Sequence, residues 1–173
     1  SELGLDCSGT LGSGYLVPFR NNKNGTTECQ FIPGYRGLIE LARRSGQIAS
    51  IEARCVYERD TFNVEYGTDM KLIHKPHLGD DPGPIHCVYA IARIVGQSDP
   101  QVDVMTHAQI ERIRQGSRAG QSGPWVDHYD EMARKTVVRR LCKYLPLSPE
   151  LEQAFSLEED VEHPLRPSPR LLG

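Results

Sequence analysis

Residues 30–47, QFIPGYRGLIELARRSGQ, run from an extended segment through Pro33-Gly34 into a helix that ends on two arginines. Four apolar residues of this stretch fall at the spacing of one helical face: Tyr35, Leu38, Ile39 and Ala42. A helix with such a stripe must pack it against other elements. The stretch therefore predicts an amphipathic helix on a core, with its charged face turned outward.

The charged face of this helix has two interpretations, which the local sequence leaves open. In the first it is an ordinary solvated face. Glu40 then pairs with Arg36 and Arg44 four residues away, the arginines of the last turn suit the negative end of the helix dipole, and Gly46 caps the helix. In the second, Arg36, Arg43 and Arg44 bind an anion.

Alternating and turn-forming residues around this helix predict strands. Residues 14–32 are typical of a β-hairpin with its turn at Asn24-Gly25. Apolar residues alternate over 51–58 and again over 62–66, which predicts a second hairpin with a turn near Asp60.

Two further strands are expected, over residues 71–75 and 85–95. The second is apolar enough to lie in the centre of a sheet. The pattern as a whole predicts the α+β class, with an N-terminal hairpin, a helix, a small antiparallel sheet and then a long basic helix.

The hydrophobic period changes to that of a helix at Thr106. Thr106 and Gln109 match a capping box, and Met105 and Ile110 occupy the positions of a hydrophobic staple. Gly116 is expected to close this helix.

A loop rich in glycine and proline, residues 116–124, should present Arg118 as a cation. Trp125 follows the loop. It is interpreted either as an anchor packed on the next helix or as a side chain that stacks on a base. Asp127 is the expected N-cap of that helix.

The helix expected over residues 128–145 is the most informative element. Its buried stripe should comprise Tyr129, Met132, Ala133, Val137, Leu141, Tyr144 and Leu145. Its basic residues are Arg134, Lys135, Arg139, Arg140 and Lys143. Three of them repeat every four residues, where like charges repel by a few tenths of a kcal/mol per pair, and the last three turns contain no acid. Phosphates would neutralise this stripe, so it predicts a polyanion-binding face, with a solvated face as the alternative.

Charge is unevenly distributed along the chain. The 173 residues include 20 bases and 23 acids, a net charge of −3. Residues 150–173 hold six acids and two bases, whereas residues 106–145 hold eight bases and four acids. The positive charge is thus concentrated around the long helix, where a nucleic acid could bind.

Cysteine usage and hydropathy predict a soluble, cytoplasmic protein. The five cysteines are scattered and form no CxxC motif, so they are expected to be thiols in a reducing compartment. The sequence has no signal peptide and no long apolar run.

Several segments together resemble the phage RecT family of single-strand DNA annealing proteins, which is related to the lambda beta protein. The resemblance is collinear over residues 3–148 and is most specific in GYRGLIELARRSG (34–46) and EMARKTVVRR (131–140). It implies a recombinase that needs no ATP, binds single-stranded DNA, assembles into rings or helical filaments and pairs complementary strands in homologous recombination. Such a protein is not an enzyme.

The resemblance also implies where DNA lies and which partners bind. The core would be a helix-flanked antiparallel sheet, with DNA in a basic groove between the first hairpin and the long helix. The residues expected to contact DNA are Arg36, Arg43, Arg44, Arg118, Trp125, Arg134, Lys135, Arg139, Arg140 and Lys143. An exonuclease and the host single-strand-binding protein are further implied partners, and the setting is a phage or prophage protein in a bacterial cytoplasm.

No cofactor is expected, because the chain lacks a GxxxxGK[ST] phosphate loop; a weak dependence on Mg²⁺ at Asp80 or Asp81 is left open. His74, His77 and His86 lie close to these aspartates and keep a metal-dependent nuclease as an alternative, although their spacing matches no standard motif. A passive single-strand-binding protein is the other alternative.

The chain is expected to divide near residue 148. Residues 1–148 would form the annealing core, and residues 149–173 an acidic, proline-flanked tail that is disordered. A tail that mimics DNA and competes for the basic groove is the alternative interpretation.

Overall fold

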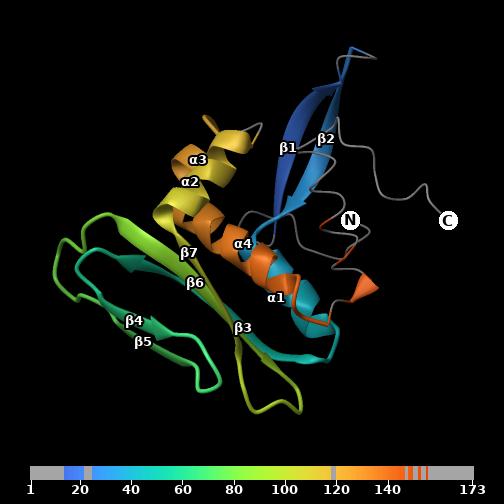
Figure 1. Cartoon of the computed structure of the whole chain (residues 1–173). Coiled ribbons are helices and arrows are strands. Elements are labelled where there is room, and N and C mark those ends of the chain that lie inside the picture. The colour runs from blue at the N-terminus through green and yellow to red at the C-terminus, as the bar shows by residue number, and fades with distance from the viewer. Residues whose placement is uncertain are drawn as a thin grey trace.

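The computed structural model describes residues 14–21, 25–117, 120–146, 148–149, 152 and 155 (Figure 1). Its elements in chain order are β1 (Gly14–Asn21), β2 (Thr26–Pro33), α1 (Tyr35–Arg44), β3 (Ile48–Tyr57), β4 (Thr61–Glu65), β5 (Lys71–Lys75), β6 (Ile85–Ile94), β7 (Gln101–Thr106), α2 (His107–Gly116), α3 (Pro124–Asp127) and α4 (Tyr129–Cys142). All strand pairs are antiparallel, which confirms the expected α+β class.

The central element is a three-stranded sheet in the order β3-β6-β7. β6 is its middle strand, as its apolar sequence predicts, and it pairs with β3 from Ile48↔Ile94 to Tyr57↔Ile85. β7 pairs with the other side of β6 and was not expected as a strand. It holds only six residues, and its polar/apolar alternation runs only from Gln101 to Val104 before the capping box of the next helix, so the local signal is short.

Helices cover one face of this sheet. α4 packs on all three strands, and α1 lies beside α4 and contacts β3 (Figure 1). Small buried side chains line this interface: Ala53, Ala90, Ala92 and Ala133. They let the helices approach the sheet closely, while Leu38, Leu41 and Leu141 fill the space between the elements.

The β4–β5 ribbon covers the opposite face. Phe62 of β4 and Leu72 of β5 pack against Val56, Cys87 and Tyr89 of the main sheet. The expected second hairpin is therefore wrong, because β3 pairs with β6 and β4 pairs with β5. β3 has ten residues and buried side chains on both faces. It therefore pairs with β6, which is equally long, and not with the five-residue β4.

The N-terminal hairpin is confirmed. β1 and β2 pair from Gly14↔Pro33 to Asn21↔Thr26, and Gly25 in the turn has a φ of 66°, a conformation that favours glycine. Figure 1 shows this hairpin projecting from the start of α1, away from the three-stranded sheet.

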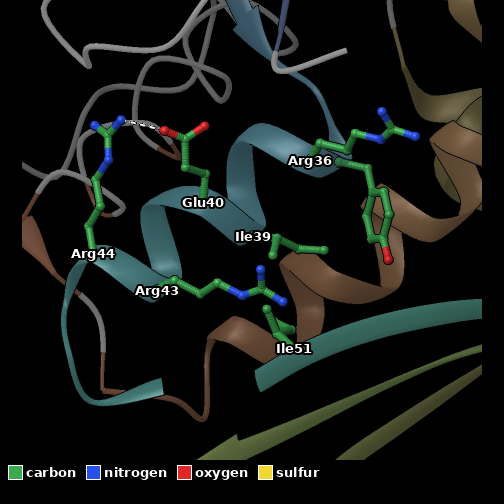
Figure 2. Close-up of a pocket in the computed structure, with 7 residues that line it drawn as sticks. Arg36, Ile39, Glu40, Arg43, Arg44 and Ile51 are labelled. Atoms are coloured by element: carbon green, nitrogen blue, oxygen red, sulfur yellow. Dashed lines mark hydrogen bonds and ion pairs between the residues drawn. The ribbon is translucent and has the colours of Figure 1, made fainter. Parts of the chain in front are cut away.

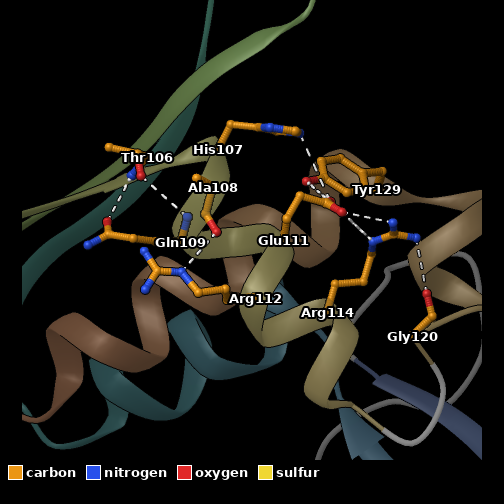
Figure 3. A network of polar contacts seen from close by, with 9 residues as sticks. All are labelled: Thr106, His107, Ala108, Gln109, Glu111, Arg112, Arg114, Gly120 and Tyr129. Atoms are coloured by element: carbon orange, nitrogen blue, oxygen red, sulfur yellow. Dashed lines mark hydrogen bonds and ion pairs between the residues drawn. The ribbon is translucent and has the colours of Figure 1, made fainter.

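The start of α2 also agrees with the sequence. The Gln109 backbone N–H donates to Thr106 Oγ1 at 3.3 Å, and the Thr106 N–H donates to Gln109 Oε1 at 3.0 Å (Figure 3). Both residues of the expected staple, Met105 and Ile110, are buried. α2 ends at Gly116, as predicted.

The start of α4 differs from the expectation. Gly123 has a φ of 59°, and Pro124 opens a separate short helix, α3, that ends at Asp127. The N-cap of α4 is His128, without a side-chain cap. Asp127 is exposed and is not the N-cap, because the extra turn shifts the helix start by one residue.

Candidate nucleic-acid interface

An open pocket of about 730 Å³ lies along α1 (Figure 2). We call it the α1 pocket; its lining residues are Tyr35, Arg36, Ile39, Glu40, Arg43, Arg44 and Ile51. Three of these residues are cationic and one is anionic. Tyr35, Ile39 and Ile51 supply an apolar floor, so the pocket combines positive charge with apolar surface.

Helix geometry explains why the cations gather here. α1 buries Gly37, Leu38, Leu41 and Ala42 against the core, which leaves its other face to solvent. Leu41 is fully buried although the expected stripe omitted it, because α1 contacts both α4 and β3. Gly46, with a φ of 69°, ends the helix and donates its N–H to the Arg43 carbonyl at 3.1 Å.

Arg43 and Arg44 have different surroundings. Arg44 Nη2 lies 2.5 Å from Glu40 Oε1, as the solvated-face interpretation predicts. Arg43 is exposed, and its guanidinium has no ion pair or hydrogen bond within the described part of the chain. Figure 2 shows Ile39 between the side chains of Arg36 and Arg43, on the side of the helix away from the Glu40–Arg44 pair.

Tyr35 ties the α1 pocket to the sheet and to α4. The Ala53 N–H donates to the Tyr35 hydroxyl at 3.0 Å, which fixes the ring against β3. The Arg134 guanidinium of α4 lies 5.7 Å from the centre of the same ring, within the range of a cation–π contact. Arg134 also donates to Glu131 at 2.8 Å, so its positive charge beside the pocket is already paired with a carboxylate.

α4 does not carry the expected exposed stripe. Lys135 is only 6 % exposed, and Arg139 is half-buried with its guanidinium 5.8 Å from the centre of the Phe155 ring. Lys143, beyond the last residue of α4, is exposed. Lys135, Arg139 and Lys143 therefore do not form one exposed stripe, because α1 and the sheet cover more of the helix than a single apolar face.

The apolar stripe expected for α4 also needs correction. Val138 and Cys142 are fully buried although they were not assigned to it, whereas Tyr144 is 72 % exposed. A helix packed on a sheet and on a second helix buries more than one row of side chains, and Tyr144 lies past the end of α4, where the periodicity no longer applies.

Arg140 points to the sheet. Its Nε and Nη2 donate to the two carboxylate oxygens of Asp103, and Nη2 also donates to the Val104 carbonyl at 2.7 Å. The sequence shows no acid in the last three turns of α4, but β7 supplies one from 37 residues away. Arg140 therefore fastens α4 to the edge strand of the sheet.

Trp125 is buried, with 3 % of its surface exposed. Its ring centre lies 5.9 Å from that of Tyr129, and its indole N–H has no acceptor among the described residues. The ring has no open face for a base in this structure, so its position favours the anchor interpretation. Arg118, the expected loop cation, lies outside the described residues.

A polar network holds α2 against α4 next to that loop (Figure 3). Glu111 accepts hydrogen bonds from Arg114 Nη2 at 2.8 Å and from the Tyr129 hydroxyl at 2.7 Å. Arg114 Nη1 also donates to the Gly120 carbonyl at 3.2 Å. The hydrogen bonds from Arg114 and Tyr129 hold the pKa of Glu111 below its usual value against the opposing effect of burial. Glu111 therefore has a structural role, because it links α2 to α4.

The histidine-rich loop gives no metal centre. Across residues 25–117 and the other described segments, no group of three or more His, Cys, Asp or Glu side chains is placed to hold a metal ion. His74 is instead bonded on both ring nitrogens, to Asp60 at 3.0 Å and to the Tyr89 hydroxyl at 3.1 Å. Asp80 and Asp81 are both exposed, and Asp81 pairs with Arg59.

Cys55, Cys87 and Cys142 offer no activated nucleophile. Burial raises the pKa of Cys55 and Cys142 to about 12 and that of Cys87 to about 11, so these thiols stay protonated. Cys29 on β2 is exposed, and the four described cysteines are free thiols.

Sequence reasoning missed two residues, one that lines the α1 pocket and one that packs on the core. Ile51 comes from β3, and no local signal connects it to α1. Phe155 packs against the main core and against Arg139, seven residues beyond the expected end of the core. An aromatic residue in an otherwise polar tail is the signal that could have revealed it.

The site and fold define a class: an α+β chain whose helical layer carries an open cationic pocket next to an antiparallel sheet. The chain belongs to the RecT family, whose model matches residues 1–168. Within residues 14–155, the described part contains no helix long and apolar enough to cross a membrane.

Two relatives show the extent of this similarity. The chain is 52 % identical to Protein RecT of Escherichia coli (strain K12) over 161 residues, which cover 92 % of this chain and 59 % of that protein. It is 29 % identical to the uncharacterized protein YqaK of Bacillus subtilis (strain 168) over 161 residues, or 92 % of this chain and 53 % of YqaK. The chain thus spans little more than half the length of these relatives.

Proposed function

We propose that this chain binds single-stranded DNA through the α1 pocket and pairs complementary strands during homologous recombination, without ATP. Membership of the RecT family supports the class of activity. The observation that carries the assignment of the surface is the exposed Arg43 beside Arg36 on an apolar floor. Arginines bind phosphates, and apolar surface can contact bases or sugars without reading sequence.

The physical task requires no nucleotide-driven motor. Duplex formation gains roughly 1.4 kcal/mol per base-pair step from stacking. A protein therefore only has to hold one strand, screen its phosphates and leave the base edges open to the incoming strand. A surface with few exposed aromatic residues and several arginines suits that task better than base-specific recognition.

The expected set of DNA contacts is refined by the positions of the side chains. We place Arg36, Arg43 and Lys143 in direct contact with phosphate, because their side chains are exposed. Arg44, Arg134 and Arg139 would contribute to the local field, because Arg44 and Arg134 are already paired with acids and Arg139 lies against Phe155. Lys135, Arg140 and Trp125 have structural positions, and Arg118 remains a candidate on sequence grounds alone.

We also propose how the protein assembles and where in the cell it acts. The outer edges of β3 and β7 pair with no other described strand, and such edges are available for contacts between subunits in a ring or filament. An exonuclease and a host single-strand-binding protein are further proposed partners, in a bacterial cytoplasm and from a phage or prophage gene. We assign the annealing core to residues 1–148 and the acidic tail to residues 149–173.

A stepwise annealing assay tests this function. A labelled oligonucleotide is bound first, its complement is added in a buffer with EDTA and without ATP, and pairing is followed by fluorescence. We expect faster pairing than without protein, with electron microscopy showing assemblies on the annealed product. Binding without faster pairing would assign a passive single-strand-binding protein, and strand degradation in Mg²⁺ would assign a nuclease.

Matched variants connect the activity to the surface. Arg36→Gln with Arg43→Gln should weaken DNA binding and slow annealing in proportion. Arg93→Gln with Arg112→Gln removes the same charge from exposed positions outside the α1 pocket and should change binding far less. Equal losses in the two variants would contradict the assignment of the surface.

A further inference from the structure

The pairing of β3 leaves some of its backbone groups facing away from β6. The Ala53 N–H donates to the Tyr35 hydroxyl at 3.0 Å, and this hydroxyl donates to the Ala53 carbonyl at 3.5 Å, so both groups of Ala53 point to the outer edge. In an antiparallel ladder only every second residue bonds to the neighbouring strand. The register is continuous over residues 50–56, so the N–H and C=O groups of Ile51 and Cys55 also point outward.

Ile51 combines deep burial with unpaired backbone groups. Only 2 % of the residue is exposed. Within the part of the chain that the structure describes, no residue bonds to its outward N–H or C=O. Nearly all buried backbone groups in folded proteins are bonded, and a buried group without a partner costs free energy. Ile51 also lines the α1 pocket, so a ligand in this pocket can complete both bonds (Figure 2).

A donor and an acceptor on one strand residue match one residue of an extended chain. When such a chain lies antiparallel to a free edge, the two facing residues exchange both N–H···O=C bonds. A phosphate offers only acceptors, so it would leave the Ile51 carbonyl unbonded. A nucleobase bound through its Watson–Crick edge would complete both bonds, but that edge would then be lost to a complementary strand.

The surroundings of Ile51 specify the side chains of such an extended chain. The facing residue places its side chain on the same face as Ile51, where Ile39 offers apolar contact. The next side chain on this face lies two residues away. The Tyr35 hydroxyl already holds the edge at Ala53, so the chain continues towards the start of β3. Arg43 lies at the end of α1 that leads into β3, so an acidic side chain at this second position can pair with it.

We propose that the α1 pocket binds an extended peptide of a partner protein, which pairs with the β3 edge at Ile51. The peptide carries an apolar residue opposite Ile51 and an acidic residue two positions later that pairs with Arg43. Peptide binding itself does not depend on the proposed function. DNA phosphate and the peptide acid would both use Arg43, so the two ligands exclude each other, and this consequence rests on the proposed function.

The first test uses the full chain without DNA and the synthetic peptide acetyl-GSLSEG-amide, whose leucine faces Ile51 and whose glutamate faces Arg43. Mass spectrometry with fragmentation follows amide hydrogen exchange at single residues. At a peptide concentration of about ten times Kd, exchange at Ile51 should slow about ten-fold, because only the free state exchanges. Cys55 also faces outward but does not line the pocket, so its exchange should stay the same.

Two altered peptides separate the two contacts. N-methylation of the leucine removes the N–H that donates to the Ile51 carbonyl and should weaken binding about ten-fold or more, whereas glutamine in place of glutamate should weaken it about three-fold. Arg43→Gln should bind the glutamate and glutamine peptides equally. Arg93→Gln removes the same charge from an exposed position outside the pocket and should keep the preference for glutamate.

Unchanged exchange at Ile51 under saturating peptide would overturn the proposal. Three other results would also overturn it. Exchange at Ile51 as slow as that at Ala53 in the dilute free chain would show that the chain itself fills this edge. Slowing that appears only at high protein concentration would assign the edge to a second copy. Slowing by an oligodeoxythymidine but not by the peptide would assign the edge to DNA.

The second test measures competition. Saturating peptide should weaken the binding of a short single-stranded oligonucleotide about ten-fold, and the N-methylated peptide at the same concentration should weaken it far less. Slower exchange at Ile51 without this competition would keep the peptide site and remove the exclusion of DNA. If the chain binds no DNA at all, the proposed function fails, while hydrogen exchange still decides the peptide site.

Discussion

Arg43 and Arg44 are adjacent in sequence, yet Arg44 pairs with Glu40 on its own helix while Arg43 extends over the α1 pocket beside Ile39 (Figure 2). A helix turns by about 100° per residue, so neighbouring side chains point to different surfaces. One arginine therefore completes a helix end, and the other is available to a ligand.

We expect Arg43→Gln to weaken single-stranded DNA binding uniformly across sequences and to reduce the log–log salt slope by roughly 0.7, the value for one lost phosphate contact. Arg44→Gln should lower the free energy of unfolding by no more than about 0.5 kcal/mol, because it removes an exposed pair of helical neighbours. Titrations between about 50 and 200 mM salt measure the first effect, and urea unfolding measures the second. An unchanged slope in Arg43→Gln would remove this residue from the interface.

Arg140 should behave as a structural residue. Arg140→Gln leaves the largely buried Asp103 carboxylate without its bidentate partner, so we expect a loss of roughly 1–3 kcal/mol in the free energy of unfolding. DNA affinity of the folded variant should stay within about two-fold of the wild type, a change of less than half a kcal/mol. The double variant D103N/R140Q should recover part of the stability, and a loss of DNA affinity without loss of stability would return Arg140 to the interface.

The Asp60 carboxyl should make stability depend on acid pH. Burial acts to raise its pKa, but hydrogen bonds from the Tyr57 and His77 N–H groups and from His74 outweigh burial and lower the pKa. A lowered folded pKa means that the carboxylate contributes stability above the unfolded value near 3.9 and that this contribution is lost as the pH falls through the folded pKa.

Urea unfolding from pH 7 to about 2.5 in the wild type and in Asp60→Asn checks this expectation. The asparagine variant should be less stable at pH 7, and the difference should shrink as the pH falls below about 4. A difference independent of pH would show that the loss comes from packing of the β4–β5 ribbon and not from ionisation.

Trp125 is the only tryptophan, so its fluorescence reports one site. Because the ring is buried against Tyr129, we expect blue-shifted emission that iodide quenches poorly. Single-stranded DNA should quench it weakly, since stacking on a base requires an exposed ring. Strong quenching by DNA together with a large loss of affinity in Trp125→Phe would restore the base-stacking interpretation.

Local sequence determined the elements with strong short-range signals. The first hairpin follows from Asn24-Gly25, α1 from its apolar stripe, and the start of α2 from the capping box at Thr106. These features depend on residues within about one turn of each other, where backbone preference and periodicity dominate. The resemblance to the RecT family was also found from the sequence, and the family match confirms it.

Tertiary structure alone decided which strands pair and which cations are available. β3 pairs with a strand 37 residues further along, from Ile48 to Tyr57 against Ile85 to Ile94, because burial on both faces requires a long apolar partner. α1 and β7 lie beside α4, and the sequence of α4 does not reveal these neighbours. Lys135 is therefore buried, and Arg140 is paired with Asp103 of β7. The pattern of charged residues indicates which side chains could face a ligand, but long-range packing decides which of them do. Each charged side chain is stabilised by the group that the fold places beside it.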